Sequence, residues 1–151
     1  IVSLYLSLGL NSVWVGGHQG LGLRTGTDRG WVDAFGRFYV TRMSEVRRAD
    51  EMLVFASARR SDPFAPSEVY EGAYDIQSPY RTGASGELWA ESWDPAAAPG
   101  SFGNLSFRHE GEAVTAFIDG HTETFGPDQL RDMRYWSRDA DAADWTLEPR
   151  D

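Results

Sequence analysis

The strongest constraint on the fold lies in residues 107–125, FRHEGEAVTAFIDGHTETF. Two runs rich in β-branched and aromatic residues, 113–118 and 121–125, flank Asp119-Gly120, and this pattern is typical of a β-hairpin. Asp-Gly favours a two-residue type I′ turn, because both central positions of that turn require φ > 0. The sequence therefore predicts two antiparallel strands joined by a tight turn at Asp119-Gly120.

Three neighbouring segments extend this hairpin into a domain. Glu110-Gly111 gives a second, weaker turn signal, so residues 105–109 should add a third strand. Residues 52–58, MLVFASA, form a continuous apolar run that is typical of a buried central strand. Residues 127–136 begin with Pro and an acidic residue, as helices often do. We therefore expect an α+β fold, in which an antiparallel sheet is joined by a short C-terminal helix.

The composition indicates a single globular domain spanning residues 1–151. The chain is 41% hydrophobic and 25% charged, which suits one domain with its own core. All 14 basic residues are arginine, and the absence of lysine excludes Schiff-base and Walker-A chemistry. The absence of cysteine excludes disulfides, thiolate metal sites and cysteine nucleophiles. The formal net charge of −9 disfavours nucleic acid and anionic membrane surfaces as partners.

The two ends of the chain differ in character. Residues 1–10 alternate between apolar and small residues, which predicts a half-buried strand, with the end of a longer helix as the alternative. Residues 138–151 are predicted to form an acidic C-terminal tail, with Trp145 as its only large apolar anchor. No window approaches the 18 apolar residues that indicate a transmembrane helix.

His109 and Asp119 are the first candidates for a catalytic pair. If the turn after His109 is tight, the middle strand separates the two residues by roughly 20 Å. A direct hydrogen bond requires about 3 Å. We therefore interpret His109, Asp119, Gly120 and His121 as structural residues of the turns, and we predict no catalytic residue. His121 should lie opposite Ile118 across the hairpin.

Two other groups of residues could bind a ligand. Asp139, Asp141 and Asp144 alternate in DADAAD, and carboxylates in such a loop can converge on Ca²⁺. The glycine and distal glutamate of an EF-hand are missing. We therefore predict no cofactor and keep Ca²⁺ as an alternative. Trp89 and Trp93 could form a platform for a glycan, whereas tryptophans in a small β-rich domain more often anchor the core.

The turn residues also carry a family resemblance. Nine residues separate His109 from Asp119-Gly120, an aromatic-Arg pair precedes the histidine, and His121 follows the glycine. This arrangement resembles the H-X9-DG signature of prepilin-like proteins, relatives of type IV pilins and pseudopilins in planctomycetes and verrucomicrobia. The resemblance extends in outline to residues 9–12 (GLNS) and to the segment MSEVRR that precedes the apolar run at 52–58.

The resemblance implies a non-catalytic structural subunit. The chain would be the head domain of a pilin-like or pseudopilin-like filament, outside the cell or in the envelope of a Gram-negative-type bacterium. Its partners would be copies of itself or other pilin-like subunits, and it would reach a membrane only through an N-terminal hydrophobic helix that this chain lacks. Two alternatives stay open: a glycan- or Ca²⁺-binding surface module, and a small hydrolase that uses His109 and carboxylates.

Overall fold

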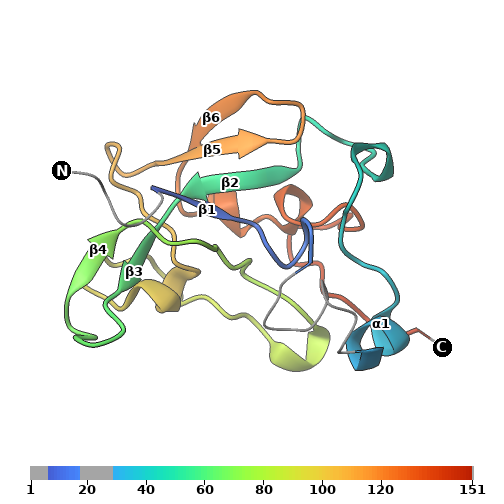
Figure 1. Cartoon of the computed structure of the whole chain (residues 1–151), viewed down its shortest axis with the longest axis horizontal. Coiled ribbons are helices and arrows are strands. Elements are labelled where there is room, and N and C mark those ends of the chain that lie inside the picture. Colours follow the sequence, from blue (N-terminus) through green and yellow to red (C-terminus); the bar gives the residue numbers. More distant parts are fainter. Residues whose placement is uncertain (1–6, 18–28, 151) are drawn as a thin grey trace.

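The computed structural model describes residues 7–17 and 29–150 (Figure 1). Its largest unit is a four-stranded antiparallel sheet in the order β1-β2-β5-β6, made of Leu8–Leu10, Leu53–Ser57, Ala113–Phe117 and Thr122–Phe125. A second antiparallel pair joins β3 (Arg59–Ser61) to β4 (Val69–Glu71). The predicted antiparallel sheet is therefore confirmed.

Helical structure is sparse in the described residues. The α-helix α1 covers Arg29–Phe35, which the sequence analysis assigned to no helix. The remaining helical segments are short 3-10 turns: η2 (Met43–Glu45), η3 (Gly83–Ser85), η4 (Pro99–Phe102), η5 (Gln129–Arg131) and η6 (Met133–Tyr135).

The strand predicted at residues 52–58 is confirmed as an internal strand. β2 pairs with β1 on one side and with β5 on the other. Leu53 and Ala56 are completely buried, while Phe55 between them is exposed. The continuous apolar run therefore places side chains on both faces of the sheet, and the core covers only one of these faces.

The hairpin at Asp119-Gly120 is confirmed, but the predicted turn type is wrong. The Gly120 N–H donates to the Phe117 carbonyl (3.0 Å), and the Phe117 N–H donates to the His121 carbonyl (3.0 Å). Of the loop residues Ile118, Asp119 and Gly120, only Gly120 has a positive φ, of 93°. This is the three-residue hairpin loop that ends in a left-handed glycine, not a type I′ turn.

A neighbouring segment explains the longer loop. The Ile118 N–H donates to the Met52 carbonyl (3.0 Å), and the Asp119 N–H donates to the Ala49 carbonyl (3.2 Å). These bonds hold the loop against the chain that enters β2. The choice of turn therefore depends on a tertiary contact that the dipeptide Asp-Gly does not encode.

Glu110-Gly111, the weaker of the two predicted turns, forms the tighter loop. Glu110 and Gly111 both have positive φ, 56° and 87°, and His109 and Glu112 exchange two backbone hydrogen bonds across them. These are the features of a two-residue type I′ turn. The predicted third strand at residues 105–109 is wrong, because this segment makes only isolated bridges to β-structure.

The predicted helix at residues 127–136 is also wrong. Two 3-10 turns, η5 and η6, occupy this segment, and Asp132 between them is extended (φ −75°, ψ 112°). The Asp132 carboxylate accepts the Arg134 N–H, and the Met133 N–H donates to the Ala143 carbonyl (3.0 Å). Neither N–H group is therefore available for the hydrogen bonds of a continuous helix, and the segment bends at Asp132.

The predicted acidic tail is integrated into the body of the protein. Ala140 and Leu147 are buried, and the Leu147 N–H donates to the Arg81 carbonyl (2.8 Å). Trp145 contacts the buried Trp14 edge to face, with ring centroids 5.7 Å apart. The segment therefore packs against the core instead of extending into solvent.

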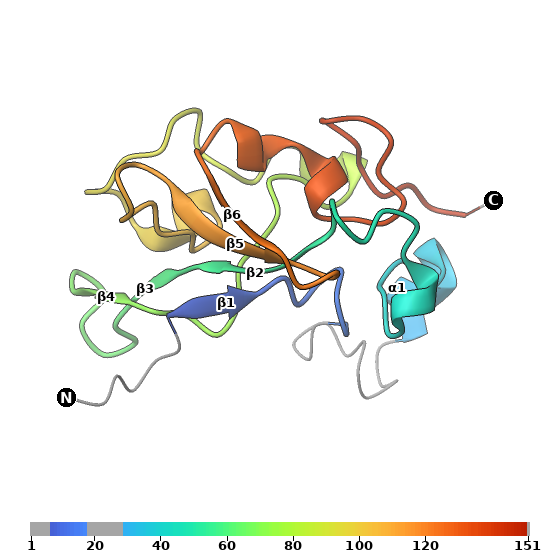
Figure 2. The ribbon, with the colours of Figure 1, turned by 90° about the horizontal axis from the view of Figure 1, so that it is seen from above.

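The core lies on one side of the four-stranded sheet. Along β5, Ala113, Thr115 and Phe117 are buried, while Val114 and Ala116 on the other face are only half-buried. Figure 2 shows the yellow η4 region and the red C-terminal segments gathered on one side of the sheet. The largest completely buried side chains include Trp14, Trp136, Phe102, Met52 and Leu53.

Residues 1–6 of the predicted N-terminal strand lie outside the described residues, and β1 reverses the predicted alternation in the part that follows. Gly9 is buried and Leu8 is exposed, so the small residue faces the interior. A Cβ atom on Gly9 would lie 2.8 Å from Ile76 Cγ2 and 3.0 Å from the Asp75 backbone carbon. The close approach of this backbone leaves no room for a side chain.

Gly9→Ala should therefore destabilise the protein, by about 1–3 kcal/mol, because it overpacks the interface between β1 and Ile76. Urea denaturation monitored by circular dichroism measures the change. Gly100→Ala is the matched control, since a Cβ atom there meets no atom within 4 Å. Equal stability of the two variants would contradict the close approach.

Candidate functional site

The uncovered face of the sheet is apolar over β1, β2 and β5, and β6 adds the exposed Thr122 and Thr124 at its edge. In neighbouring strands Leu10 pairs with Phe55, and Phe55 pairs with Ala116, so these side chains lie side by side on one face. Phe55 is 40% exposed and Leu8 is 39% exposed, although both belong to strands of the main sheet. An antiparallel sheet with one covered face usually carries polar residues on the other. This face departs from that rule.

A groove of about 500 Å³ runs along the same face. Its walls are mainly apolar and include Val15, Val40, Val54, Phe55 and Ile118. Met43, in η2, stands at the groove with 67% of its surface exposed. A concave surface of this kind is suited to contact with an apolar segment of protein.

The four motif residues occupy two separate turns. His109 is exposed at the Glu110-Gly111 turn, and Asp119 is exposed at the far end of β5. Within residues 7–17 and 29–150, no hydrogen bond or ion pair joins the His109 ring to a carboxylate. The structure thus does not bring His109 and Asp119 together.

Asp119 instead contacts His121. The His121 Nδ1 atom lies 2.6 Å from Asp119 Oδ1, and the His121 backbone N–H donates to the same oxygen (3.1 Å). The imidazole stacks on the Phe117 ring, with centroids 4.4 Å apart and planes 1° from parallel. His121 was predicted to lie opposite Ile118, and this is wrong because the three-residue loop places it opposite Phe117.

These contacts lower the pKa of Asp119 from its usual value of 3.8, first through the His121 backbone N–H and then through the imidazole. A carboxyl-carbon NMR titration should therefore give a midpoint below 3.8 for Asp119. Because its folded-state pKa is depressed, Asp119 stabilises the hairpin above the unfolded pKa, and this contribution is lost as the pH falls through the folded value.

His121→Ala is the control for this titration. Alanine retains the backbone N–H and loses the imidazole, so the Asp119 midpoint should rise only part of the way toward 3.8. An unchanged midpoint would show that the ring does not contribute, and a complete return to 3.8 would exclude the backbone bond as the main cause.

Neither tryptophan considered for a glycan platform is exposed. Trp89 is 5% exposed, donates Nε1–H to the Gln77 carbonyl (2.9 Å) and packs on Phe102 at 4.3 Å. Trp93 is half-buried, and the Arg59 guanidinium lies 5.4 Å from the centre of its ring. A platform needs exposed rings, so the platform prediction is wrong for Trp89.

The three aspartates of DADAAD do not form a metal site in the described part of the chain. No group of three or more His, Asp or Glu residues there is placed to hold a metal ion. Asp139 lies 3.5 Å from the Arg138 Nε atom, while Asp144 faces a hollow that it shares with Tyr80 and Tyr135. The predicted convergence of Asp139, Asp141 and Asp144 on Ca²⁺ is therefore wrong.

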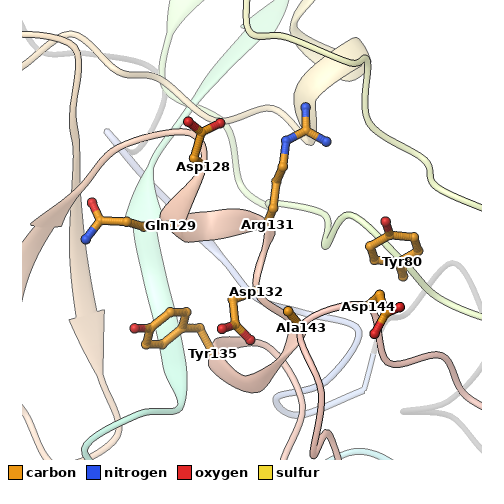
Figure 3. Close-up of a pocket in the computed structure, with 8 residues that line it drawn as sticks. All are labelled: Tyr80, Asp128, Gln129, Arg131, Asp132, Tyr135, Ala143 and Asp144. Carbon is orange, nitrogen blue, oxygen red and sulfur yellow. The ribbon is translucent and has the colours of Figure 1, made fainter.

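A second hollow, of about 360 Å³, lies beside η5 and η6 (Figure 3). It is lined by two tyrosines, three aspartates, one glutamine, one arginine and one alanine: Tyr80, Tyr135, Asp128, Asp132, Asp144, Gln129, Arg131 and Ala143. The sequence alone does not predict this hollow, because a continuous helix at 127–136 would spread its polar side chains around one axis. The bend at Asp132 brings the two 3-10 turns beside residues 80 and 143–144.

Comparison of the chain with protein-family models, with curated proteins and with solved structures finds no match. Among the described residues, no helix has the length and apolar character needed to cross a bilayer.

Proposed function

We propose that the protein is the head domain of a pilin-like or pseudopilin-like filament subunit, located outside the cell or in the envelope. The observation that supports this most directly is the apolar groove on the uncovered sheet face. A long apolar segment, such as a hydrophobic helix encoded with this domain, would cover that face and complete a helix-on-sheet arrangement. The H-X9-DG resemblance supports the same assignment.

The energetics of the groove favour a protein occupant. Complete burial of a Phe side chain contributes about 1.5–3 kcal/mol, and Phe55 still has 40% of its surface to bury. Val54, Ile118 and Met43 add further apolar area at the same groove. The groove thus offers several side chains to one elongated partner, as filament packing requires.

The motif residues have a structural role in this proposal. Asp119 and His121 fix the hairpin loop, and Ile118 and Gly120 of the same loop line the groove. His109 shapes the opposite turn of β5. The signature then specifies the shape of the sheet at both ends of β5 and needs no catalytic chemistry.

Expression of the tagged full-length gene in its native cells tests the proposal. The protein should enter a high-molecular-weight fraction that mechanical shearing releases, and Phe55→Asp should reduce its amount there at least about tenfold, because a buried unpaired carboxylate costs more than 1.4 kcal/mol. Phe64→Asp is the matched control, since Phe64 is 96% exposed and lies outside the sheet. Recovery of the wild-type protein only as a free monomer would contradict the proposal.

A further inference from the structure

The hollow beside η5 and η6 is separate from the apolar groove and shares no lining residue with it. Figure 3 shows Tyr80 and Tyr135 on opposite sides, with Asp132 and Ala143 between them. Burial, and then neighbouring carboxylates, raise the pKa of both tyrosines. The Tyr80 hydroxyl already hydrogen-bonds the Glu87 carboxylate, whereas the Tyr135 hydroxyl stays protonated at neutral pH and can donate a hydrogen bond.

Two charged side chains of the hollow are already paired. Arg131 binds Glu87 and donates to the carbonyls of Ala90 and Glu91, which fixes its guanidinium away from a ligand. The Asp132 carboxylate accepts a hydrogen bond from the Arg134 Nε–H group (2.9 Å). Neither group is free to act as the main charge that holds an ionic ligand.

Asp128, Asp144 and Gln129 keep side-chain atoms that are available to a ligand. The carboxylates of Asp128 and Asp144 have no side-chain hydrogen bond or ion pair with another described residue. Gln129 accepts the Gly126 N–H through Oε1 (3.0 Å), which leaves its NH₂ group available. The hollow therefore offers two carboxylate acceptors, the Gln129 amide and the Tyr135 hydroxyl, and it is bordered by two aromatic rings.

We propose that this hollow binds a neutral sugar unit of a glycan. Sugar hydroxyls donate to carboxylates and accept from amide and phenol groups, while the apolar face of the sugar can pack against an aromatic ring. This inference is independent of the filament proposal. It transfers the glycan function considered for Trp89 and Trp93 to different residues.

Charge distinguishes the neutral sugar from other ligands. Asp128, Asp132 and Asp144 would repel an anionic sugar, and the net charge of −9 adds to this repulsion. A cation would meet Asp128 and Asp144, which are exposed, and exposed ion pairs contribute only about 0.2–1 kcal/mol. A neutral polyol matches the donors and acceptors without either cost.

NMR titration of the ¹⁵N-labelled protein tests this site with three probes of similar size: maltotriose, triglucosamine and trigalacturonate. Maltotriose should shift amide signals of residues 80, 128–135 and 143–144, and the other two probes should bind at least about threefold more weakly. Tyr135→Ala should weaken maltotriose binding about tenfold through loss of one packed ring. Tyr74→Ala, which removes a tyrosine that is 68% exposed elsewhere, should leave it unchanged.

The site would be disproved if maltotriose caused no shift in the hollow, or if triglucosamine bound more tightly than maltotriose. Asp144→Asn provides a second variant that keeps the side-chain shape and lies at an exposed position, so the fold should tolerate it. It should weaken maltotriose binding severalfold, because an amide is a poorer acceptor than a carboxylate. Unchanged binding in both Tyr135→Ala and Asp144→Asn would also overturn the assignment.

Discussion

Asn11→Asp should lower the free energy of unfolding by about 4 kcal/mol at neutral pH. Asn11 is completely buried, and its Nδ2 group donates to the carbonyls of Leu53 (2.9 Å) and Trp136 (3.0 Å). It thereby ties β2 to the C-terminal segment. A carboxylate at this position would lose both donors and direct a negative charge at two carbonyl oxygens.

Urea denaturation at pH 7 and pH 4 measures this effect. Burial would raise the pKa of the introduced carboxyl above its unfolded value, so the destabilisation should be complete at pH 7 and smaller at pH 4. Asn104→Asp is the matched control, because Asn104 is only half-buried and its Nδ2 contact is long, at 3.5 Å. Similar losses for the two variants would contradict the role assigned to Asn11.

Trp136→Ala should lower the free energy of unfolding by about 3–5 kcal/mol, since it opens a cavity in the core. Trp136 is completely buried, its Nε1–H donates to the Leu130 carbonyl (2.8 Å), and its ring meets Trp89 edge to face at 5.8 Å. The side chain fills the space between the η5–η6 segment and the Trp89 region. Its loss should affect both.

Thermal and urea unfolding of three variants separates the causes. Trp136→Phe keeps an aromatic ring but leaves the Leu130 carbonyl without its donor, so it should lose less stability than Trp136→Ala. Trp145→Ala is the comparison at a half-buried tryptophan and should also cost less. A Trp145→Ala variant less stable than Trp136→Ala would show that the C-terminal segment, not Trp136, holds the core together.

Local sequence signals located the central part of the sheet. The apolar run at 52–58 became the internal strand β2, and Asp119-Gly120 became the loop between β5 and β6. Both predictions succeeded because neighbouring residues fully express the relevant preference: strand propensity in one case and a left-handed glycine in the other. The groove was not predicted, because the exposure of Phe55 depends on what packs against the sheet.

The sequence by itself determined where the hairpin turns lie and that the apolar run at 52–58 forms an internal strand, because turns and strands depend on residues a few positions apart. Only the tertiary structure decided the turn types, the bend at Asp132, the burial of Trp89 and the packing of the C-terminal segment. Each of these depends on partners distant in the sequence: the carbonyls of Ala49 and Met52 for the hairpin, Ala143 for Met133, and Arg81 for Leu147. Such contacts outweigh local preference because a buried backbone donor without a partner costs about 1–3 kcal/mol.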